Sequence, residues 1–487
     1  MPHQQNAGHL AIAERVREGL GHAPTGGQER AIDAIARLIA TPQSKATLIL
    51  KGYAGTGKTT LLGAVVVALR KQRMPVVLLA PTGRAAKVLA AHSGKDASTI
   101  HRRIYRVGEE ADGFSLGLAP NKEAGALFIV DEASMIGGPS VDEGFGSRDL
   151  LSDLLEHVFM APDCKLLLVG DPAQLPPVGS DRSPALSVQA LRRIGLVAGA
   201  VELTEVVRQA EASGILRNAT DLRALLTSAA LAPASVHREA GDTIPRFTPF
   251  ADVIRTDGHD LQDSLESAYA RDGDEEVSVI TRSNKRAYLY NQQVRARIHG
   301  YEEELSPGDR LMVVKNNYLW AGLNGKPELI ANGEPITMKR LHRTEERYGL
   351  RFADLTVSWW SGQEERELEV KVMLDTLAAE SPALPSPRMK LLLQSVRTAH
   401  AGKPRREQLK LMREDPYANA LQVKYAYAVT CHKAQGGQWR TVFVDQGYIT
   451  EEMVDNEYLR WLYTAVTRAT DRLHLLNFHP RFWGDQD

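Results

Sequence analysis

The apolar positions of residues 25–205 fall into short continuous runs, separated by segments with helical periodicity. The runs are "ATLIL", "PVVLLA", "ALFIVDE" and "KLLLVGD". Uninterrupted apolar runs of this length are typical of parallel strands that helices cover on both faces. The pattern therefore predicts an α/β fold, a parallel sheet with crossover helices. A β-hairpin around a Gly/Asp turn is predicted within this block, from the segment "YRVGEEADGFSLGLAPN" (105–121).

A second α/β block begins near Val201, and its strands include "EVSVITRS" and "TVFVD". An insertion of different character interrupts it. There "SPGDRLMVVKNN", "LIANGEPITMKRL" and "DLTVSWW" are short strand patterns between Gly, Pro and Asn turns, which predict a small β-barrel. A Pro-rich connector and a basic helical segment follow. We expect a first domain over 1–204 with its hairpin at 102–125, a second domain over 205–302 and 418–487, and the insertion over 303–417.

Composition narrows the class of protein. The chain has 487 residues, 43% hydrophobic and 24% charged, which is typical of a globular protein with several domains. No apolar run reaches the ~18 residues of a membrane span, and the N-terminus lacks the apolar core of a signal peptide. Two cysteines, Cys164 and Cys431, are too few for a disulfide framework and fit a reducing cytosol. A net charge of −1 still leaves room for a local basic groove.

The segment "LILKGYAGTGKTTLL" has the G-x-x-x-x-G-K-T spacing between a predicted strand and a predicted helix. Glycines let the backbone wrap closely around phosphate oxygens, which then accept hydrogen bonds from main-chain N–H groups at the helix N-terminus. Lys58 can reach the β- and γ-phosphates, and the Thr59 hydroxyl suits Mg²⁺. The expected nucleotide-binding residues of this loop are Gly52, Ala54, Gly55, Thr56, Gly57, Lys58, Thr59 and Thr60.

Two further strands end in polar residues that suit the same site. Asp131 and Glu132 follow "ALFIV", and carboxylates at the carboxyl end of a parallel strand face the phosphates. Asp131 would hold Mg²⁺ through water, and Glu132 would orient and deprotonate the attacking water. In "LLLVGDPAQLPPVG", the Gln174 amide would lie beside the γ-phosphate on a proline-stiffened loop. A phosphate loop alone leaves kinase, GTPase, transporter and motor open.

Eight segments, in order along nearly the whole chain, resemble the motifs of superfamily 1 helicases, most closely the RecD-like and Dda-like members of the 5′-to-3′ group. They are "PTGGQERAI", "LLAPTGRAAKVL", "ASTIHRRIY", "VDEASM", "GDPAQLPPVG", "LTEVVRQ", "YAVTCHKAQGGQW" and "WLYTAVTRATDRLHLL". The resemblance implies two tandem RecA-like parallel-sheet domains, with a small β-hairpin in the first and an SH3-like β-barrel in the second. It also implies an ATP-dependent DNA helicase or translocase.

The resemblance assigns roles around an ATP bound between the two domains. Gln28 would read the adenine, and Gln438 would lie near the nucleotide sugar, where many relatives carry Glu; nucleotide preference therefore stays open. Two arginines would reach the γ-phosphate from the second domain, and the guanidinium fork matches phosphate oxygens. Hydrolysis would then be fast only when the domains close. The expected catalytic residues are Lys58, Glu132, Gln174, Arg208 and Arg468, with ATP and Mg²⁺ as cofactors.

The resemblance also places single-stranded DNA across both domains. Hydroxyl, imidazole and backbone N–H groups bind phosphate oxygens without reading sequence. The expected contacts are Pro81, Thr82, Thr99, His101, Asn284, Thr430, His432 and Lys433. In the second domain, "TRSNKRAYLYNQQVRARIH" (281–299) has basic residues and two tyrosines but no Asp or Glu. It suits either a sequence-blind single-strand track or a solvated helix face whose tyrosines enter the core.

Cys431 stands beside His432, which raises the alternatives of a thiol–imidazole pair or half of a metal site. No CxxC or HxxxH spacing supplies further zinc ligands. Adjacent residues on a predicted strand would also point to opposite faces. We interpret Cys431 as a small buried side chain.

Two rival functions stay open at this point. One is a DNA-stimulated ATPase that remodels protein–DNA complexes without processive unwinding; the other is an RNA helicase of the Upf type, although such enzymes usually carry zinc modules that this sequence lacks. The expected partners are single-stranded and partial-duplex DNA together with single-strand-binding, replication or repair proteins, and no membrane. We expect a functional monomer in the cytoplasm, associated with the nucleoid, of bacterial or phage origin.

Overall fold

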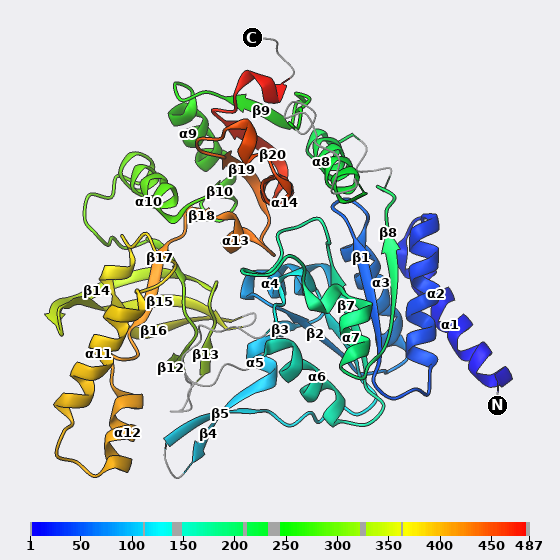
Figure 1. Cartoon of the computed structure of the whole chain (residues 1–487), viewed down its shortest axis with the longest axis horizontal. Coiled ribbons are helices and arrows are strands. Elements are labelled where there is room, and N and C mark those ends of the chain that lie inside the picture. The colour runs from blue at the N-terminus through cyan, green and yellow to red at the C-terminus, as the bar shows by residue number, and fades with distance from the viewer. Residues whose placement is uncertain are drawn as a thin grey trace.

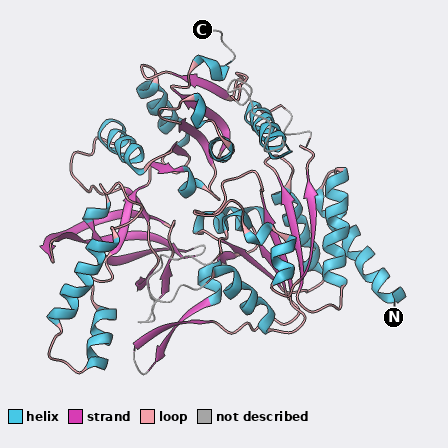
Figure 2. Ribbon diagram, viewed as in Figure 1, coloured by secondary structure: helices cyan, strands magenta, loops and turns pink. Residues whose placement is uncertain are grey.

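The computed structural model describes residues 2–110, 113–138, 149–207, 212–231, 244–321, 328–361 and 364–483. Two parallel sheets, each flanked by helices, and a β-barrel make up the chain (Figure 1). The first sheet and its helices form one half of the molecule, and the second sheet and the barrel form the other (Figure 2). This is the predicted pair of RecA-like domains, with a hairpin inserted in the first and a barrel in the second.

The first sheet has the strand order β3-β2-β6-β7-β1-β8, and all its neighbouring strands are parallel. Its strands are β1 (Ala46–Gly52), β2 (Val76–Ala80), β3 (Ala97–Thr99), β6 (Leu127–Val130), β7 (Lys165–Gly170) and β8 (Val197–Leu203). Its helices are α1 (Pro2–Leu20), α2 (Gly26–Ala40), α3 (Lys58–Lys71), α4 (Gly83–Ser93), α5 (Ile100–Ile104), α6 (Leu150–Met160) and α7 (Val188–Arg193), with 3₁₀ turns at η1 (Ala133–Met135) and η2 (Pro184–Leu186).

The apolar runs become strands that are buried on both faces. In β1, Leu48 and Leu50 face a cluster formed with α1, α2 and α3, whereas Ile49 faces the cluster that contains α6. The same alternation holds in β6, where Phe128 and Ile129 join opposite clusters. Successive side chains of a strand point to opposite faces, so only an uninterrupted apolar run can fill both cores.

The residues around Val201 correct one expectation. They form β8, which pairs with β1 along its whole length, so this segment closes the first sheet and does not open the second. The hydrophobic pattern could not separate the two possibilities, because an edge strand and a first strand have the same apolar spacing.

The hairpin predicted over 105–121 consists of β4 (Tyr105–Glu110) and β5 (Gly113–Leu118), an antiparallel pair. Its base is fixed to α6, since the Tyr105 hydroxyl donates to Asp153 at 2.6 Å and the His157 ring contacts the Ala119 carbonyl at 2.8 Å. The hairpin therefore projects from a rigid base, near α12 (Arg405–Glu414) of the insertion (Figure 1).

The second sheet has the order β18-β10-β19-β20-β9, again parallel. Its strands are β9 (Val253–Thr256), β10 (Val277–Thr281), β18 (Ala428–Thr430), β19 (Trp439–Asp445) and β20 (Ala469–Leu476). Its helices are α8 (Gly214–Leu231), α9 (Leu261–Asp272), α10 (Asn284–Gln293), which continues as the π-turn η5 (Val294–Ile298), α13 (Cys431–Ala434) and α14 (Asn456–Val466), with 3₁₀ turns at η8 (Glu451–Met453) and η9 (Pro480–Trp483).

The barrel is closed by five strands in the order β11-β14-β15-β16-β17. They are β11 (Arg310–Val313), β14 (Pro335–Arg347), β15 (Leu350–Ser361), β16 (Glu364–Met373) and β17 (Leu421–Tyr425), with the hairpin β12 (Asn317–Ala321) and β13 (Glu328–Ile330), the turn η7 (Leu374–Thr376), α11 (Ser386–Ala399) and α12. Strand β17 runs almost directly into β18 of the second sheet. The barrel and the second domain also share one buried cluster, in which Val277 and Tyr290 join Leu311 and Val357.

A buried ion pair strengthens that connection. Arg295 of η5 donates to both carboxylate oxygens of Asp309 at 2.8 Å, and both side chains are almost fully buried. On its other side the barrel reaches the first domain: the Arg102 guanidinium of α5 lies 5.1 Å from the centroid of the Trp359 ring. Within the insertion, the Trp359 indole donates to Glu334 at 2.6 Å. The barrel therefore contacts both domains.

Candidate functional site

The phosphate loop lies between β1 and α3. Gly55 and Gly57 have φ angles of 75° and 77°, a left-handed conformation that glycine adopts without a side-chain penalty. The Lys58 ammonium donates to the carbonyls of Gly52 at 2.7 Å and Tyr53 at 2.9 Å. A Cβ on Gly52 would stand 2.8 Å from the Lys58 side chain, so only glycine leaves room for it. Thr59 and Thr60 follow in the first turn of α3.

Two segments cover this loop from outside. Gln28 is fully buried; its amide oxygen accepts from Thr25 in a capping box at the start of α2, and its amide nitrogen donates to the Thr56 carbonyl at 3.4 Å. From the other side, the Val207 N–H donates to the Gly55 carbonyl at 3.0 Å. Arg208, the next residue, lies outside the described residues. Gln28 thus links helix α2 to the backbone of the phosphate loop.

Asp131 and Glu132 follow β6 at the carboxyl edge of the sheet. Glu132 has a φ of 53°, which for a residue other than glycine costs on the order of 1–3 kcal/mol. Its N–H donates to the Asp131 carboxylate at 2.9 Å. Burial raises the pKa of both carboxyl groups, and the nearby Lys58 ammonium opposes that shift in each. A carboxylate with a raised pKa is the better proton acceptor once it is ionised.

Helix α14 of the second domain holds the loop after β7 of the first. The Tyr463 hydroxyl donates to Asp171 at 2.7 Å and accepts from the Ala54 N–H of the phosphate loop at 2.9 Å. The Thr464 hydroxyl accepts from the Leu175 N–H at 2.8 Å, and Arg460 donates to the Gln174 carbonyl at 3.2 Å. These three side chains stand at i, i+3 and i+4 and so share one helix face.

Arg468, just after α14, is almost fully buried and faces the first domain. Its guanidinium lies 3.9 Å from the Glu132 carboxylate and donates to the carbonyls of Thr464 and Gly437, both at 3.1 Å. Arg468 opposes the burial effect on the pKa of Glu132, lowering it. An arginine of one domain therefore lies next to the expected general base of the other.

Gln174 is buried, and its side-chain oxygen has no hydrogen-bond partner among the described residues. Gln438 has an exposed side chain, and its backbone carbonyl accepts from Arg84 of α4 at 3.1 Å. The Arg84 guanidinium lies 3.8 Å from the centroid of the Trp439 ring. The structure thus brings Lys58, Glu132, Gln174 and Arg468 to one seam and places Gln438 where that seam meets α4.

Arg460, Tyr463, Thr464 and Arg84 were not among the expected site residues. For the first three a signal existed, because "RWLYTAVTR" puts them and Arg468 at helical spacing on one face. Their partners are mostly main-chain groups of a distant loop, and sequence spacing cannot reveal such contacts.

The residues of the first domain that we expect to contact DNA lie at the carboxyl ends of β-strands in its sheet. Pro81 and Thr82 follow β2, and Thr82 caps α4 by accepting from the Ala85 N–H at 3.2 Å. Thr99 ends β3 and caps α5 through the Arg102 N–H, and it is buried. Burial lowers the pKa of His101 to about 4, so its imidazole is neutral at pH 7.

The second-domain residues meet this edge. Thr430 ends β18, His432 is exposed on α13, and the Lys433 ammonium donates to the Asn332 amide oxygen of a barrel loop. A Cβ on Gly436 would lie 2.8 Å from the Ala85 Cβ and 3.2 Å from the Thr82 hydroxyl. The loop after α13 therefore packs directly on the start of α4, and Thr82 lies beside the second domain. Asn284 is half-buried at the start of α10.

The basic segment 281–299 divides into structural and accessible residues. Arg295 is the buried partner of Asp309, Arg286 pairs with the buried Asp445, and Tyr290 is buried. Lys285 pairs with Glu380 at 3.4 Å, and Tyr288 stays half-buried. Most of the basic side chains in this segment are therefore paired with carboxylates of the protein. This weakens the interpretation of the segment as a continuous binding surface for single-stranded DNA.

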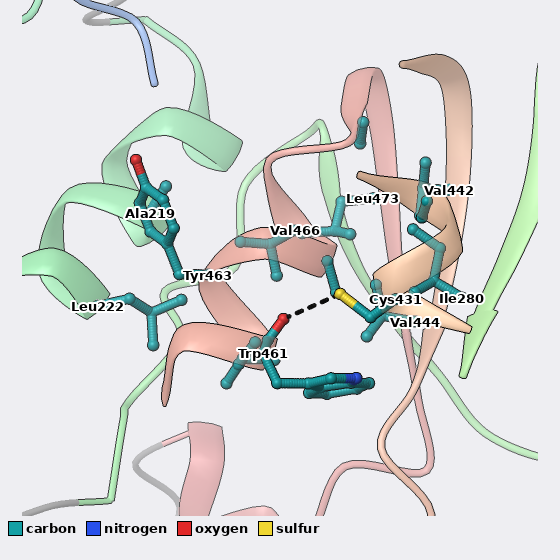
Figure 3. Close-up of a cluster of buried hydrophobic side chains, with 14 of the residues drawn as sticks. Ala219, Leu222, Ile280, Cys431, Val442, Val444, Trp461, Tyr463, Val466 and Leu473 are labelled. Carbon is teal, nitrogen blue, oxygen red and sulfur yellow. Dashed lines mark hydrogen bonds between the residues drawn. The ribbon is translucent and has the colours of Figure 1, made fainter. Parts of the chain in front are cut away.

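Cys431 belongs to the core of the second domain (Figure 3). It is the first residue of α13 and does not lie on a strand, so the opposite-face argument was wrong although the side chain is buried as expected. The thiol donates to the Trp461 carbonyl at 3.4 Å, and burial raises its pKa. A protonated, enclosed thiol cannot act as a nucleophile. No group of three or more His, Cys, Asp or Glu side chains in the described part of the chain could hold a metal ion.

A phosphate loop in one parallel-sheet domain, facing an arginine from a second such domain, is the architecture of a two-domain P-loop helicase. Comparison with protein families agrees: residues 25–237 match the family described as AAA domain, and residues 425–476 match the UvrD-like helicase C-terminal domain. None of the described helices has the length and apolar character that crossing a membrane requires.

Known proteins are similar along most of the chain. The ATP-dependent RecD2 DNA helicase of Deinococcus radiodurans is 27% identical over 95% of this chain and 50% of its own length. The ATP-dependent DNA helicase dda of Enterobacteria phage T4 is 26% identical over 72% of this chain and 77% of its own. The solved structure of a Bacteroides Pif1 helicase with ADP-AlF3 and ssDNA is 15% identical, with a TM-score of 0.44 over 95% of this chain and 94% of its own. The chain thus spans half the length of the RecD2 relative.

Along most of its length the chain is thus similar to superfamily 1 helicases of the RecD2 and Dda group.

Proposed function

We propose that this chain is an ATP-dependent DNA helicase that moves 5′-to-3′ along single-stranded DNA and separates duplex strands. The observation that carries the proposal is the seam between the domains. Arg468 stands 3.9 Å from Glu132, while Tyr463 joins the phosphate loop to Asp171. Both RecD2 and Dda are ATP-dependent DNA helicases by name.

Closure of the seam then switches hydrolysis on. Lys58 and the loop N–H groups bind the phosphates, and Glu132 accepts a proton from the attacking water. Arg468 supplies positive charge to offset the negative charge that develops on the γ-phosphate, an effect worth about 10³–10⁵ in rate in related phosphoryl transfers. Because Arg468 belongs to the other domain, hydrolysis and product release change the contact between domains. That change is the motion that moves the strand.

Thr59 and Asp131 would hold Mg²⁺ in this proposal. The ion takes oxygen ligands, keeps several waters and needs few protein groups, and a hydroxyl beside the phosphate loop with a carboxylate at the carboxyl edge of the same sheet fits that requirement. When bound, the ion would neutralise charge on the phosphate oxygens.

The single-stranded DNA would run from Thr82 and His101 of the first domain to Thr430 and Lys433 of the second. It would cross the place where Gly436 packs on α4. Hydroxyls, a neutral imidazole and an ammonium favour the backbone over the bases, so we expect sequence-independent binding. These residues come from both domains, so a change at the seam changes the spacing of the strand contacts.

The decisive test uses two partial duplexes, one with a 5′ single-stranded tail and one with a 3′ tail. We expect ATP-dependent opening of the 5′-tailed duplex and none by Lys58→Ala, which should still bind the strand. Opening of only the 3′-tailed duplex would contradict the polarity, and turnover by Lys58→Ala would contradict the phosphate site.

The hairpin distinguishes this proposal from a remodelling ATPase that does not unwind. Tyr105 and Leu118 are opposite each other in the β4–β5 ladder, so removing residues 107–117 leaves the two ends close together. We expect the shortened chain to lose unwinding and to keep strand-stimulated ATP hydrolysis. Equal loss of both activities would count against a strand-separating hairpin. We further propose a monomeric enzyme that acts in the cytoplasm at the nucleoid, with single-strand-binding or replication and repair proteins as partners.

A further inference from the structure

A pocket opens where α10, the barrel and the start of β18 meet. Its base is formed by buried side chains, among them Ala287, Met312, Val314 and Leu377. Half-buried polar groups line the rest of it, namely Asn284, Tyr288, Lys424, Thr430 and Lys433. Three of these, Asn284, Thr430 and Lys433, are expected strand contacts. Lys424 is not; it belongs to β17, the strand that closes the barrel.

The two lysines line the same pocket, and the Lys424 charge acts on Lys433. The Lys424 ammonium donates to the main-chain carbonyls of Thr376, at 3.3 Å, and Ala379, and Lys433 donates to an amide oxygen. Within the described ranges, neither ammonium has a carboxylate within the 4.0 Å of an ion pair; Glu380, next to Ala379 in the chain, pairs with Lys285 instead. Two like charges in a partly desolvated site repel each other, and a bound anion would relieve that repulsion.

Their titration agrees with this geometry. Burial lowers the pKa of Lys424 to about 8, and burial together with the Lys424 charge lowers the pKa of Lys433 to about 8. A lysine whose only role were to support the fold would gain from a carboxylate partner, as Lys371 of β16 does with Asp354 and Glu345. Lys424 has main-chain carbonyls for its partners, which supply no net negative charge.

We propose that Lys424 and Lys433 together bind one backbone phosphate of the translocating single strand, so that the barrel contributes a residue to the strand path. The inference rests on the proposed function, because it needs a strand that passes Thr430 and Lys433. The remaining donor positions of two ammonium groups can face the same phosphate, with no base being read. The barrel is then part of the track and moves with the second domain.

The test compares Lys424→Gln and Lys424→Arg in binding to a fluorescent sixteen-nucleotide oligo-dT without ATP, over a range of salt concentrations. Removing one of the two ammonium groups that share this phosphate should lower the magnitude of the slope of log affinity against log salt by up to about 0.7. We expect Lys424→Gln to show that change, with binding about tenfold weaker at low salt, and Lys424→Arg to keep the wild-type slope. Lys339→Gln, which removes a barrel lysine paired with Glu365 at 3.7 Å, is the matched control and should keep the wild-type slope.

The outcomes separate the inference from the proposed function. If the wild-type chain does not bind the oligonucleotide, the proposed function fails. If the wild type binds and Lys424→Gln has the same slope, the inference fails alone. An equal loss by Lys424→Arg and Lys424→Gln, with a lowered unfolding temperature in both, would assign Lys424 to the support of Thr376 and Ala379 and would also overturn it. Lys433→Gln provides a second variant, for which the same drop in slope is expected.

Discussion

The two domains meet along two seams of different construction. At the nucleotide seam, side chains of the second domain reach into loops of the first: Arg468 faces Glu132, and Tyr463 and Thr464 bind the loop after β7. At the strand seam, the Gly436 backbone packs closely on Ala85 and Thr82 at the start of α4. Hydrogen bonds and charges respond to the chemistry of a ligand, whereas close packing transmits displacement. On the proposed function, one seam responds to the nucleotide and the other moves the DNA strand.

The largest effect is expected at the nucleotide seam. Arg468→Ala removes the positive charge beside Glu132 and should lower the strand-stimulated turnover of ATP by about 10³, with strand binding unchanged. Steady-state ATPase assays with saturating oligo-dT measure it. Arg468→Lys keeps the charge without the planar fork and should recover only part of the rate. Wild-type ATP turnover by Arg468→Ala would contradict the claim that the nucleotide seam contributes to hydrolysis.

Tyr463→Phe tests a second contact of the nucleotide seam. It leaves the Ala54 N–H and the Asp171 carboxylate without the shared hydroxyl, a cost of about 1–3 kcal/mol. We expect about a tenfold loss in kcat/KM for ATP. Tyr458→Phe is the matched control on the same helix, because its hydroxyl donates to Gln446 within the second domain. If both variants lose the same activity, the loss reflects stability of α14 and not a contact between domains.

Gly436→Ala tests the strand seam. The added Cβ would stand 2.8 Å from Ala85, at a φ of 71°. We expect the rate of unwinding to fall about fivefold relative to ATP turnover, since the seam must open slightly. Gly447→Ala meets nearly the same backbone strain, with a φ of 69°, but its Cβ would have 3.5 Å to Arg286 and no contact with the first domain. Equal uncoupling by both variants would refute a packing role for Gly436.

The smallest effect is expected from raising the pH in a DNA-binding assay. Lys424 and Lys433, whose pKa values are about 8, are mostly charged at pH 7 and mostly neutral at pH 9. Phosphate binding favours the charged form, so affinity for oligo-dT should fall about threefold or more from pH 7 to pH 9. The double variant Lys424→Arg with Lys433→Arg should lose this dependence, because arginine stays protonated. The same pH change with both arginines present would assign the effect to other groups.

Much of the fold could be predicted from the local pattern of the sequence. The phosphate loop, the strand ending at Asp131, the hairpin at 105–121 and the barrel were all predictable, because apolar spacing and turn residues are written in consecutive positions. The pattern also predicted two α/β domains with an insertion in the second, whereas an ATP site between the domains came only from the resemblance to helicases.

What the sequence could not reveal depends on contacts between distant segments. Arg295 reads as a surface cation, yet Asp309 buries it in the core. Val201 reads as the start of a new sheet, yet it pairs with β1. Tyr463 shares a helix face with Arg468 in the sequence, but only the packing of the domains shows that its hydroxyl meets the phosphate loop. In each case the partner lies in another element of the chain.

A structure of this chain with oligo-dT and ADP–aluminium fluoride tests most directly whether the second domain completes the catalytic centre. If it does, the Arg468 guanidinium leaves the Gly437 carbonyl and lies within about 3 Å of the aluminium fluoride, next to Glu132. A guanidinium that still binds Gly437, out of hydrogen-bonding reach of the filled site, would contradict that claim.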